Sequence, residues 1–171
     1  MERPHGNCYW VSERFLAGEC PGAKDAALAR QRLRRHLQVG VTVFLDLTEP
    51  GELVRYDELL RQEATQLGRA ASYHRLPIPD VSVPKTRAQM GAILDRVDDS
   101  LAAGQTVYLH CWGGVGRTGT VVGCYLVRHG LSGEAALARL ASWWQQVDKV
   151  WRQPHSPETA EQRAYVRSWV E

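Results

Sequence analysis

Short apolar runs alternate with longer amphipathic stretches along the chain. Residues 41–45 and 106–109 are β-branched or aromatic runs of the length of a buried strand, and residues 72–76 form a third candidate. Near the N-terminus, residues 9–11 and 15–17 flank a polar Ser-Glu-Arg turn, which predicts a short hairpin or an edge strand.

Six segments between and after these runs predict helices. Residues 118–129 are apolar on nearly all sides, which predicts a central, buried helix. The other five segments are residues 24–38, 56–67, 86–101, 133–147 and 158–170. Strands that alternate with helices, with the last helices clustered behind the final strand, predict an α/β fold in which helices flank a central, mostly parallel sheet.

Composition and charge narrow the class of protein. The chain has 171 residues, of which 44% are hydrophobic and 23% charged, and this profile predicts one domain over residues 1–171. A formal net charge of +2 is too small to indicate a nucleic-acid partner, and no apolar stretch is long enough to span a bilayer. The N-terminal residues lack the apolar run of a secretory signal, so we expect neither export nor membrane insertion.

Four cysteines are too few for a disulfide scaffold, and no Cys-x-x-Cys pair predicts a zinc site. We therefore expect reduced thiols, a cytoplasmic location and no metal. The sequence leaves a pair between Cys8 and Cys20 open, and Cys124 is interpreted as a small buried apolar residue.

The chemistry concentrates in residues 110–120, HCWGGVGRTGT, between a predicted strand and the buried helix. The three glycines allow successive backbone N–H groups to turn toward one point, and the helix N-terminus points its dipole there, so the segment predicts a phosphate cradle. Cys111 lies in the same positive field, which favours a nucleophilic thiolate. Arg117 supplies a planar fork for two phosphate oxygens.

Two nucleotide-binding interpretations of this segment fail. Residues 114–119 match the pattern GxGxxG, but the strand with an acidic residue expected about 20 positions later is missing, because helical sequence follows. A nucleoside-triphosphate loop would need a lysine where Arg117 stands.

The segment resembles the His-Cys-x5-Arg-Thr/Ser signature of the cysteine-dependent protein phosphatases. In particular it is similar to the compact dual-specificity group, which includes the kinase-associated phosphatase and its bacterial relatives. Residues 77–80, Pro-Ile-Pro-Asp, resemble the loop that carries the general acid in this group. The resemblance implies the dual-specificity phosphatase fold and hydrolysis of phosphomonoesters through a phosphocysteine intermediate, without a cofactor.

The resemblance also implies catalytic roles. Cys111 would attack phosphorus, Arg117 would stabilise the equatorial oxygens, and Asp80 would protonate the leaving group. Thr118 would hydrogen-bond the departing thiolate, and His110 would support the loop without touching substrate. Asp46 is the alternative acid, although it more readily caps the turn that follows its strand.

Substrate would bind to the loop itself, at Trp112, Gly113, Gly114, Val115, Gly116 and Arg117. Gln162 resembles a C-terminal glutamine that positions water in some family members, and a solvent-facing glutamine is the alternative. Arg30, Arg32, Arg34 and Arg35 are interpreted as the solvated face of an amphipathic helix.

We therefore expect a dual-specificity or tyrosine-type protein phosphatase, acting on a phosphorylated protein or a small phosphomonoester as a monomer. The cysteine loop lacks the lysines that phosphoinositide-specific members of the family carry there, which disfavours an inositol headgroup as the substrate. A phosphatase for a small metabolite or an RNA end, a non-catalytic phosphate-binding module and a sulfur transferase that uses a Cys111 persulfide are the alternatives.

Overall fold

A five-stranded sheet organises the chain, and the computed structural model describes all residues 1–171. The strand order is β1-β2-β5-β3-β4, with bounds β1 Cys8–Ser12, β2 Phe15–Gly18, β3 Val43–Asp46, β4 Ser72–Arg75 and β5 Val107–His110. Only β1 runs antiparallel to its neighbour, so the expected N-terminal hairpin and the mostly parallel sheet are both confirmed.

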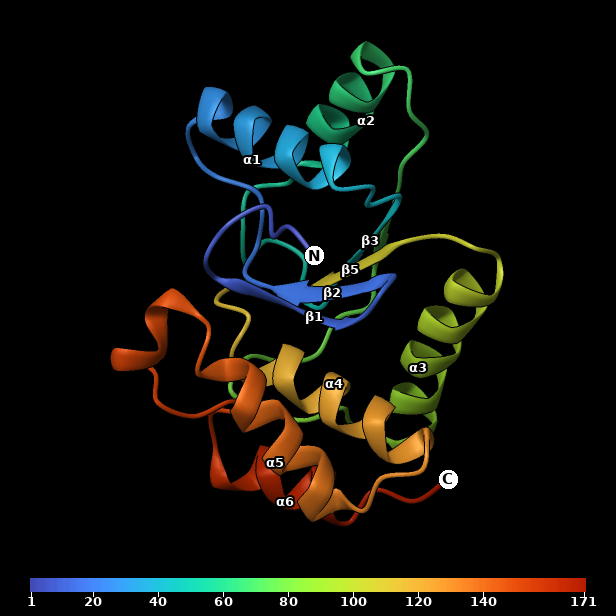
Figure 1. Cartoon of the computed structure of the whole chain (residues 1–171), viewed down its shortest axis with the longest axis vertical. Coiled ribbons are helices and arrows are strands. Elements are labelled where there is room, and N and C mark those ends of the chain that lie inside the picture. Colours follow the sequence, from blue (N-terminus) through green and yellow to red (C-terminus); the bar gives the residue numbers. More distant parts are fainter.

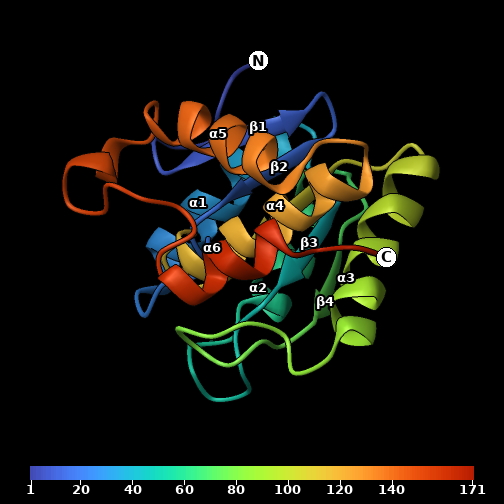
Figure 2. The same ribbon diagram turned by 90° about the horizontal axis from the view of Figure 1, so that it is seen from below.

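Helices cover both faces of this sheet (Figure 1). One face carries α1 (Ala26–Gln38) and α2 (Asp57–Gln66), and the other carries α3 (Arg87–Ala102), α4 (Gly116–Arg128), α5 (Gly133–Trp144) and α6 (Ala160–Arg167). Figure 2 shows α4 lying close beneath the strands with α5 and α6 outside it. This position of α4 agrees with its nearly uniform apolar sequence. No helix is long and apolar enough to cross a membrane.

Side chains alternate between two apolar cores, because successive residues of a strand point to opposite faces. In β3 and β5, Phe44 and Tyr108 belong to the smaller core of 11 residues under α1 and α2. Leu45 and Leu109 belong to the larger core of 24 residues under the other four helices. Both faces of the strands are therefore buried, as their continuous apolar runs predict.

Helix boundaries differ from the predicted ones where capping decides them. The last helix begins at Ala160 because Thr159 and Gln162 form a reciprocal capping box. The helix predicted over residues 133–147 ends at Trp144, whose indole Nε1 donates to the Gln153 carbonyl at 2.6 Å. A 3₁₀ turn, Asp148–Trp151, follows it.

Parallel pairing places four strand ends side by side. Asp46 at the end of β3 lies opposite His110 of β5 and Arg75 of β4, while Gly18 of β2 lies opposite His110 on the other side. The loops that follow β2, β3, β4 and β5 consequently meet at one edge of the sheet, where α/β proteins commonly bind ligands.

Candidate active site

The segment that follows β5 forms a tight loop that leads directly into α4. His110 ends the strand and α4 begins at Gly116, two residues before the predicted start, so Arg117 and Thr118 lie in its first helical turn. None of the backbone N–H groups of residues 112–116 has a hydrogen-bond acceptor within the protein. The loop therefore presents free amide donors and a helix N-terminus at one place.

Donors from outside the loop fix its carbonyl groups. The Cys20 amide donates to the Trp112 carbonyl at 2.9 Å, the Lys149 ammonium donates to the Gly113 carbonyl at 2.8 Å, and the Ser156 hydroxyl donates to the Val115 carbonyl at 2.8 Å. Because the carbonyls are held outward, the amides of the loop turn inward.

Two glycines of the loop are required by contacts and by backbone conformation. Gly114 has φ +73°, and a Cβ atom there would overlap the backbone of Gly18. A Cβ atom at Gly116 would lie 2.8 Å from the Gln162 side-chain nitrogen. The loop is thus packed against both the N-terminal and the C-terminal part of the chain.

The loop surrounds a pocket of about 290 Å³. Eight of the predicted site residues line it: Asp80, Cys111, Trp112, Gly113, Val115, Gly116, Arg117 and Gln162. Val81, Gln153 and Glu158 line the pocket as well. Gly114, Thr118 and His110 do not line it, and Thr118 is fully buried with no hydrogen-bond partner for its hydroxyl. The structure therefore brings the predicted nucleophile, arginine and acid to one cavity.

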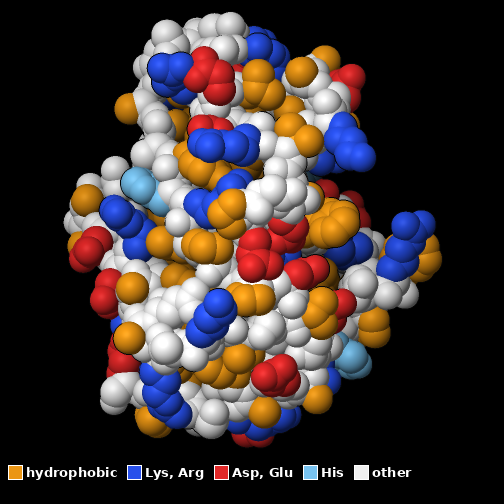
Figure 3. Space-filling view, turned by 180° about the vertical axis from the view of Figure 1, so that it is seen from behind, with side chains coloured by type: hydrophobic (Ala, Val, Ile, Leu, Met, Phe, Trp, Pro, Cys, Tyr) orange, Lys and Arg blue, Asp and Glu red, His pale blue; other side chains and the backbone are white.

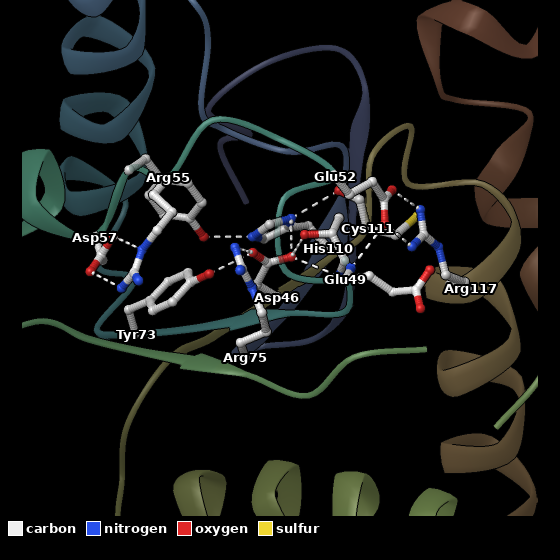
Figure 4. Close-up of polar contacts among 12 residues, drawn as sticks. Asp46, Glu49, Glu52, Arg55, Asp57, Tyr73, Arg75, His110, Cys111 and Arg117 are labelled. Atoms are coloured by element: carbon white, nitrogen blue, oxygen red, sulfur yellow. Dashed lines mark hydrogen bonds and ion pairs between the residues drawn. The ribbon is translucent and has the colours of Figure 1, made fainter. Parts of the chain in front are cut away.

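Arg117 is held by a carboxylate that the sequence did not single out. Its two terminal nitrogens donate to the two oxygens of Glu52 at 2.8 and 2.5 Å, and Nη1 also donates to the Ile78 carbonyl at 3.2 Å. Figure 4 shows Glu52 facing the guanidinium, with the sulfur of Cys111 beside it. Burial disfavours the charge of Arg117, but the bonds to Glu52 outweigh this and raise the arginine pKa.

Asp80 also reaches Arg117. Its Oδ1 lies 2.9 Å from Nη2 of Arg117 and accepts the Val81 amide at 2.9 Å. The Asp80 side chain is 50% exposed, whereas that of Arg117 is 1% exposed. Asp80 is therefore a half-exposed loop carboxylate that nevertheless faces the cradle.

A buried polar network lies behind the loop. Nδ1–H of His110 donates to the Cys111 carbonyl at 2.9 Å, and its Nε2 accepts from the Tyr56 hydroxyl at 2.5 Å. Desolvation lowers the pKa of His110, so the imidazole is neutral. This arrangement fixes the tautomer and ties the strand end to the cysteine.

Asp46 belongs to that network and does not line the pocket. It accepts hydrogen bonds from the amide and hydroxyl of Thr48 at 2.8 and 2.7 Å, which confirms that it caps the following turn. Its other oxygen accepts from Tyr73 at 2.6 Å and from Arg75 at 3.2 Å. Burial alone would raise the pKa of Asp46, but the hydrogen bonds from Tyr73 and Thr48 lower it.

Gln162 is fully buried, so the solvent-facing alternative is wrong. Its side-chain oxygen accepts the Thr159 amide at 3.1 Å, and its nitrogen donates to the Ser82 carbonyl at 3.0 Å. Gln162 thereby joins α6, the loop that carries Asp80 and the phosphate cradle at Gly116.

The sequence of residues 6–166 matches the PTP-SAK family, described as "Swiss Army Knife protein, DSP-PTPase phosphatase domain". The chain belongs to this family. The predicted relationship to the dual-specificity phosphatases is therefore confirmed, and the domain is of the cysteine-based phosphatase type.

Curated relatives of this PTP-SAK domain include tyrosine phosphatases. The putative tyrosine phosphatase 067L of Invertebrate iridescent virus 3 is 36% identical over 123 residues, which cover 69% of this chain and 44% of the viral protein. The protein tyrosine phosphatase domain-containing protein 1 of Mus musculus is 32% identical over 69% of this chain and 16% of the mouse protein. The chain thus spans less than half the length of these two relatives.

Solved structures share the fold of this PTP-SAK domain. Tk-PTP in its active form is 22% identical with a TM-score of 0.74, covering 96% of this chain and 98% of that one. The kinase-associated phosphatase, with serine in place of its catalytic cysteine, is 21% identical with a TM-score of 0.71, covering 95% and 91%. TpbA of P. aeruginosa is 19% identical with a TM-score of 0.67, covering 99% and 89%.

Glu52 is the main residue of this PTP-SAK site that our sequence reasoning missed. A signal for it existed: Glu52 follows the strand that pairs with β5, and loops after neighbouring parallel strands meet at one edge of the sheet. The loop after β3 carries two glutamates, Glu49 and Glu52, and the structure shows that Glu52 is the one that binds Arg117.

Proposed function

We propose that the protein is a phosphomonoesterase of the dual-specificity type that removes phosphate from phosphorylated side chains of proteins through a phosphocysteine intermediate. The observation that carries this proposal is that Cys111 and Arg117 open into one pocket whose loop amides have no acceptor. Asp80 enters the same pocket from a separate loop.

Binding of a phosphate would begin at the free amides and at Nε of Arg117. A guanidinium has five N–H groups. In this structure Nη1 and Nη2 are engaged by Glu52, the Ile78 carbonyl and Asp80, while Nε has no partner within the protein. A second contact from Arg117 to phosphate requires that Asp80 release Nη2.

Release of Asp80 would couple binding to acid catalysis. When a phosphate dianion replaces Asp80 at Arg117, the carboxyl group loses a cationic neighbour and gains an anionic one. Both changes favour its protonated form. Asp80 would then stand beside the leaving oxygen with a proton to donate.

The reaction would proceed in two steps. The Cys111 thiolate attacks phosphorus, the bond to the leaving oxygen breaks, and that oxygen takes the proton of Asp80. Water then attacks the phosphocysteine, Asp80 accepts a proton from it, and the thiolate leaves. The loop amides and Arg117 stabilise the equatorial oxygens in both steps, with Glu52 holding the guanidinium in place.

Thr118 and Gln162 would serve the second step. The Thr118 hydroxyl is buried without a partner, so it can turn toward the sulfur at no cost in lost hydrogen bonds. Gln162 borders the pocket and could orient water there, although both of its polar atoms already bind backbone groups.

The test is hydrolysis of p-nitrophenyl phosphate by the purified protein. We expect turnover that is lost in Cys111→Ser, which keeps the pocket and removes the nucleophile. If the wild type is no faster than Cys111→Ser, the proposed activity is wrong. Retained binding of phosphopeptides in that case would favour a non-catalytic phosphate-binding module instead.

A substrate panel then decides between phosphoproteins and other phosphate esters. Structures that share this fold include PTPMT1 in complex with PI(5)P (20% identical, TM-score 0.68) and the inositol pyrophosphate phosphatase SIW14 of S. cerevisiae (15% identical, TM-score 0.67). The loop of this chain carries Trp112, Gly113 and Val115, none of them cationic. We expect phosphopeptides to be hydrolysed faster than phosphoinositides, sugar phosphates or nucleotides.

A further inference from the structure

A second cavity of about 490 Å³ lies beside the phosphate pocket. We refer to it as the flanking pocket; its walls include Gly22, Lys24, Arg32, Leu53, Val54 and Trp112. Trp112 is the one residue that lines both cavities. A group attached to a phosphate in the first cavity can therefore reach the flanking pocket around this tryptophan.

The flanking pocket has a cationic wall without carboxylate partners. Lys24 is exposed and forms no ion pair or hydrogen bond, and Arg32 donates only to the Gly22 carbonyl, at 3.4 Å. Elsewhere in α1, Arg30 and Arg34 bind Glu63, whose side chain is fully buried, and Arg35 is exposed without an ion pair. Arg34 and Arg35 are exposed, as the solvated-face interpretation of this basic run predicts, whereas Arg30 and Arg32 are partly buried. Arg32 lines the flanking pocket.

The two carboxylates that border the flanking pocket are already neutralised. Glu19 binds the Lys149 ammonium at 2.5 Å, and Glu52 binds Arg117. The charge left to attract a ligand is thus positive. On the face of the molecule shown in Figure 3, Lys and Arg side chains intermingle with Asp and Glu side chains.

The opposite wall is apolar and exposed. Val54 is 54% exposed and Trp112 is 59% exposed. Exposed apolar side chains at a cavity rim gain free energy when a ligand with apolar groups covers them. A polyphosphorylated sugar ring offers little apolar surface, whereas a polypeptide offers both aliphatic carbon and acidic groups.

Resting on the proposed phosphatase activity, we propose that the flanking pocket is a specificity subsite that binds an acidic side chain near the phosphorylated residue of a protein substrate. Lys24 and Arg32 bind the carboxylate, and Trp112 and Val54 cover the intervening peptide. An extended chain advances about 3.3 Å per residue, so an acidic residue up to three positions from the phosphorylated one lies within about 10 Å of it along the chain.

The test uses phosphotyrosine peptides in which one glutamate is moved through the three positions on either side, each matched by a glutamine peptide. For the wild type we expect at least one position where glutamate raises kcat/KM about three- to tenfold, the effect of one or two partly solvated charge pairs. In the double variant Lys24→Gln, Arg32→Gln this ratio falls to about one. The ratio in the wild type also shrinks at high salt.

Arg14→Gln is the matched control, because it removes one positive charge from the turn before β2, at the opposite edge of the sheet. Arg14→Gln should keep the wild-type ratio of kcat/KM between the glutamate and glutamine peptides. Both Arg14→Gln and the double variant should hydrolyse p-nitrophenyl phosphate at the wild-type rate. A wild type that never distinguishes glutamate from glutamine would overturn the subsite, as would a ratio that survives in the double variant.

Two further outcomes separate the subsite from the proposed activity. If the protein does not hydrolyse p-nitrophenyl phosphate, the affinities of Cys111→Ser and of its Lys24→Gln, Arg32→Gln derivative for the same peptides replace the rates. Equal affinity for the glutamate and glutamine peptides then refutes the subsite. A double variant that loses hydrolysis of inositol polyphosphates but keeps its peptide preference shows that the flanking pocket binds those molecules instead.

Discussion

The cysteine loop, residues 111–117, and the acid loop, residues 77–84, meet at Arg117 but are held in different ways. The cysteine loop has its carbonyls bonded to donors from three other segments, and Arg117 is almost completely buried. In the acid loop, Ile78 is buried, while Asp80 and Val81 are exposed and Val81 has φ +57°.

This contrast separates two tasks. The group that binds charge in the transition state gains from being fixed before substrate arrives, because no reorganisation is then needed. The group that delivers a proton must leave Arg117 and approach the leaving oxygen. Hydrogen bonds from Gln89 to the Pro77 carbonyl, from the Ile78 amide to the Leu47 carbonyl and from Gln162 to the Ser82 carbonyl anchor the acid loop on both sides of Asp80. The ion pair of Asp80 with Arg117 must break before its carboxylate can reach the leaving oxygen.

Gly114→Ala should break the cysteine loop and have the largest effect. The new Cβ would overlap the Gly18 backbone, and alanine would have to adopt the positive φ of Gly114. We expect the free energy of unfolding to fall by about 3 kcal/mol or more and phosphatase activity to be lost. Urea denaturation measures the loss of stability. Gly113→Ala is the matched control, because its Cβ would make only ordinary contact, at 3.4 Å from Val115, and it should change stability by about 0.5 kcal/mol or less.

Asp80→Asn should leave the cysteine loop intact and remove the proton donor. We expect unchanged stability and a rate about a hundredfold lower or more with poor leaving groups, but a much smaller loss with good ones. Steady-state kinetics over a series of aryl phosphates measures this slope. A uniform loss across the series would show that Asp80 is not the acid.

Glu52→Gln should loosen Arg117 without emptying the pocket. Glutamine offers one acceptor oxygen where the carboxylate offered two charged ones, so the guanidinium loses its two-point hold. We expect kcat/KM to fall about tenfold, largely through a higher KM. Glu13→Gln, in the turn at the opposite edge of the sheet, should have no effect; equal activity of Glu52→Gln and wild type would show that Arg117 needs no support.

Acidification should destabilise the folded protein through its buried histidines, and this is the smallest of the expected effects. Desolvation lowers the pKa of His36 to about 3 and also lowers that of His110, so below pH 6.5 the unfolded chain binds protons that the folded chain does not. Stability is therefore lost as the pH falls. Between pH 7 and pH 6 we expect these two histidines to reduce the free energy of unfolding by about 1 kcal/mol in urea titrations. A stability that is equal at pH 7 and pH 6 would show that the buried imidazoles become charged in the folded protein.

The sequence could predict those parts of the site whose residues are contiguous in the chain. Cys111, the glycines and Arg117 share one loop, and the apolar run before it and the helix after it specify its position. Asp80 was accessible through the prolines around it and the resemblance to a known acid loop.

The remaining parts depend on packing between distant segments. Glu52 reaches Arg117 across 65 positions of sequence, and no local pattern distinguishes it from a solvated glutamate. Gln162 looks like any polar residue in the first turn of a helix, yet it is buried because α6 packs against the cradle at Gly116. The partners of Arg30 and Arg34 likewise come from a different helix.

The anchoring of the cysteine loop has a consequence for modularity. Its carbonyls are held by Cys20 near one end of the chain and by Lys149 and Ser156 near the other. The signature motif therefore does not fold into its active conformation by itself. Grafted onto another strand–helix junction, it would lose the contacts that orient its amides. A fragment that lacks the N-terminal hairpin would lose part of these contacts as well. The smallest autonomous catalytic unit of this fold extends from β1 to α6.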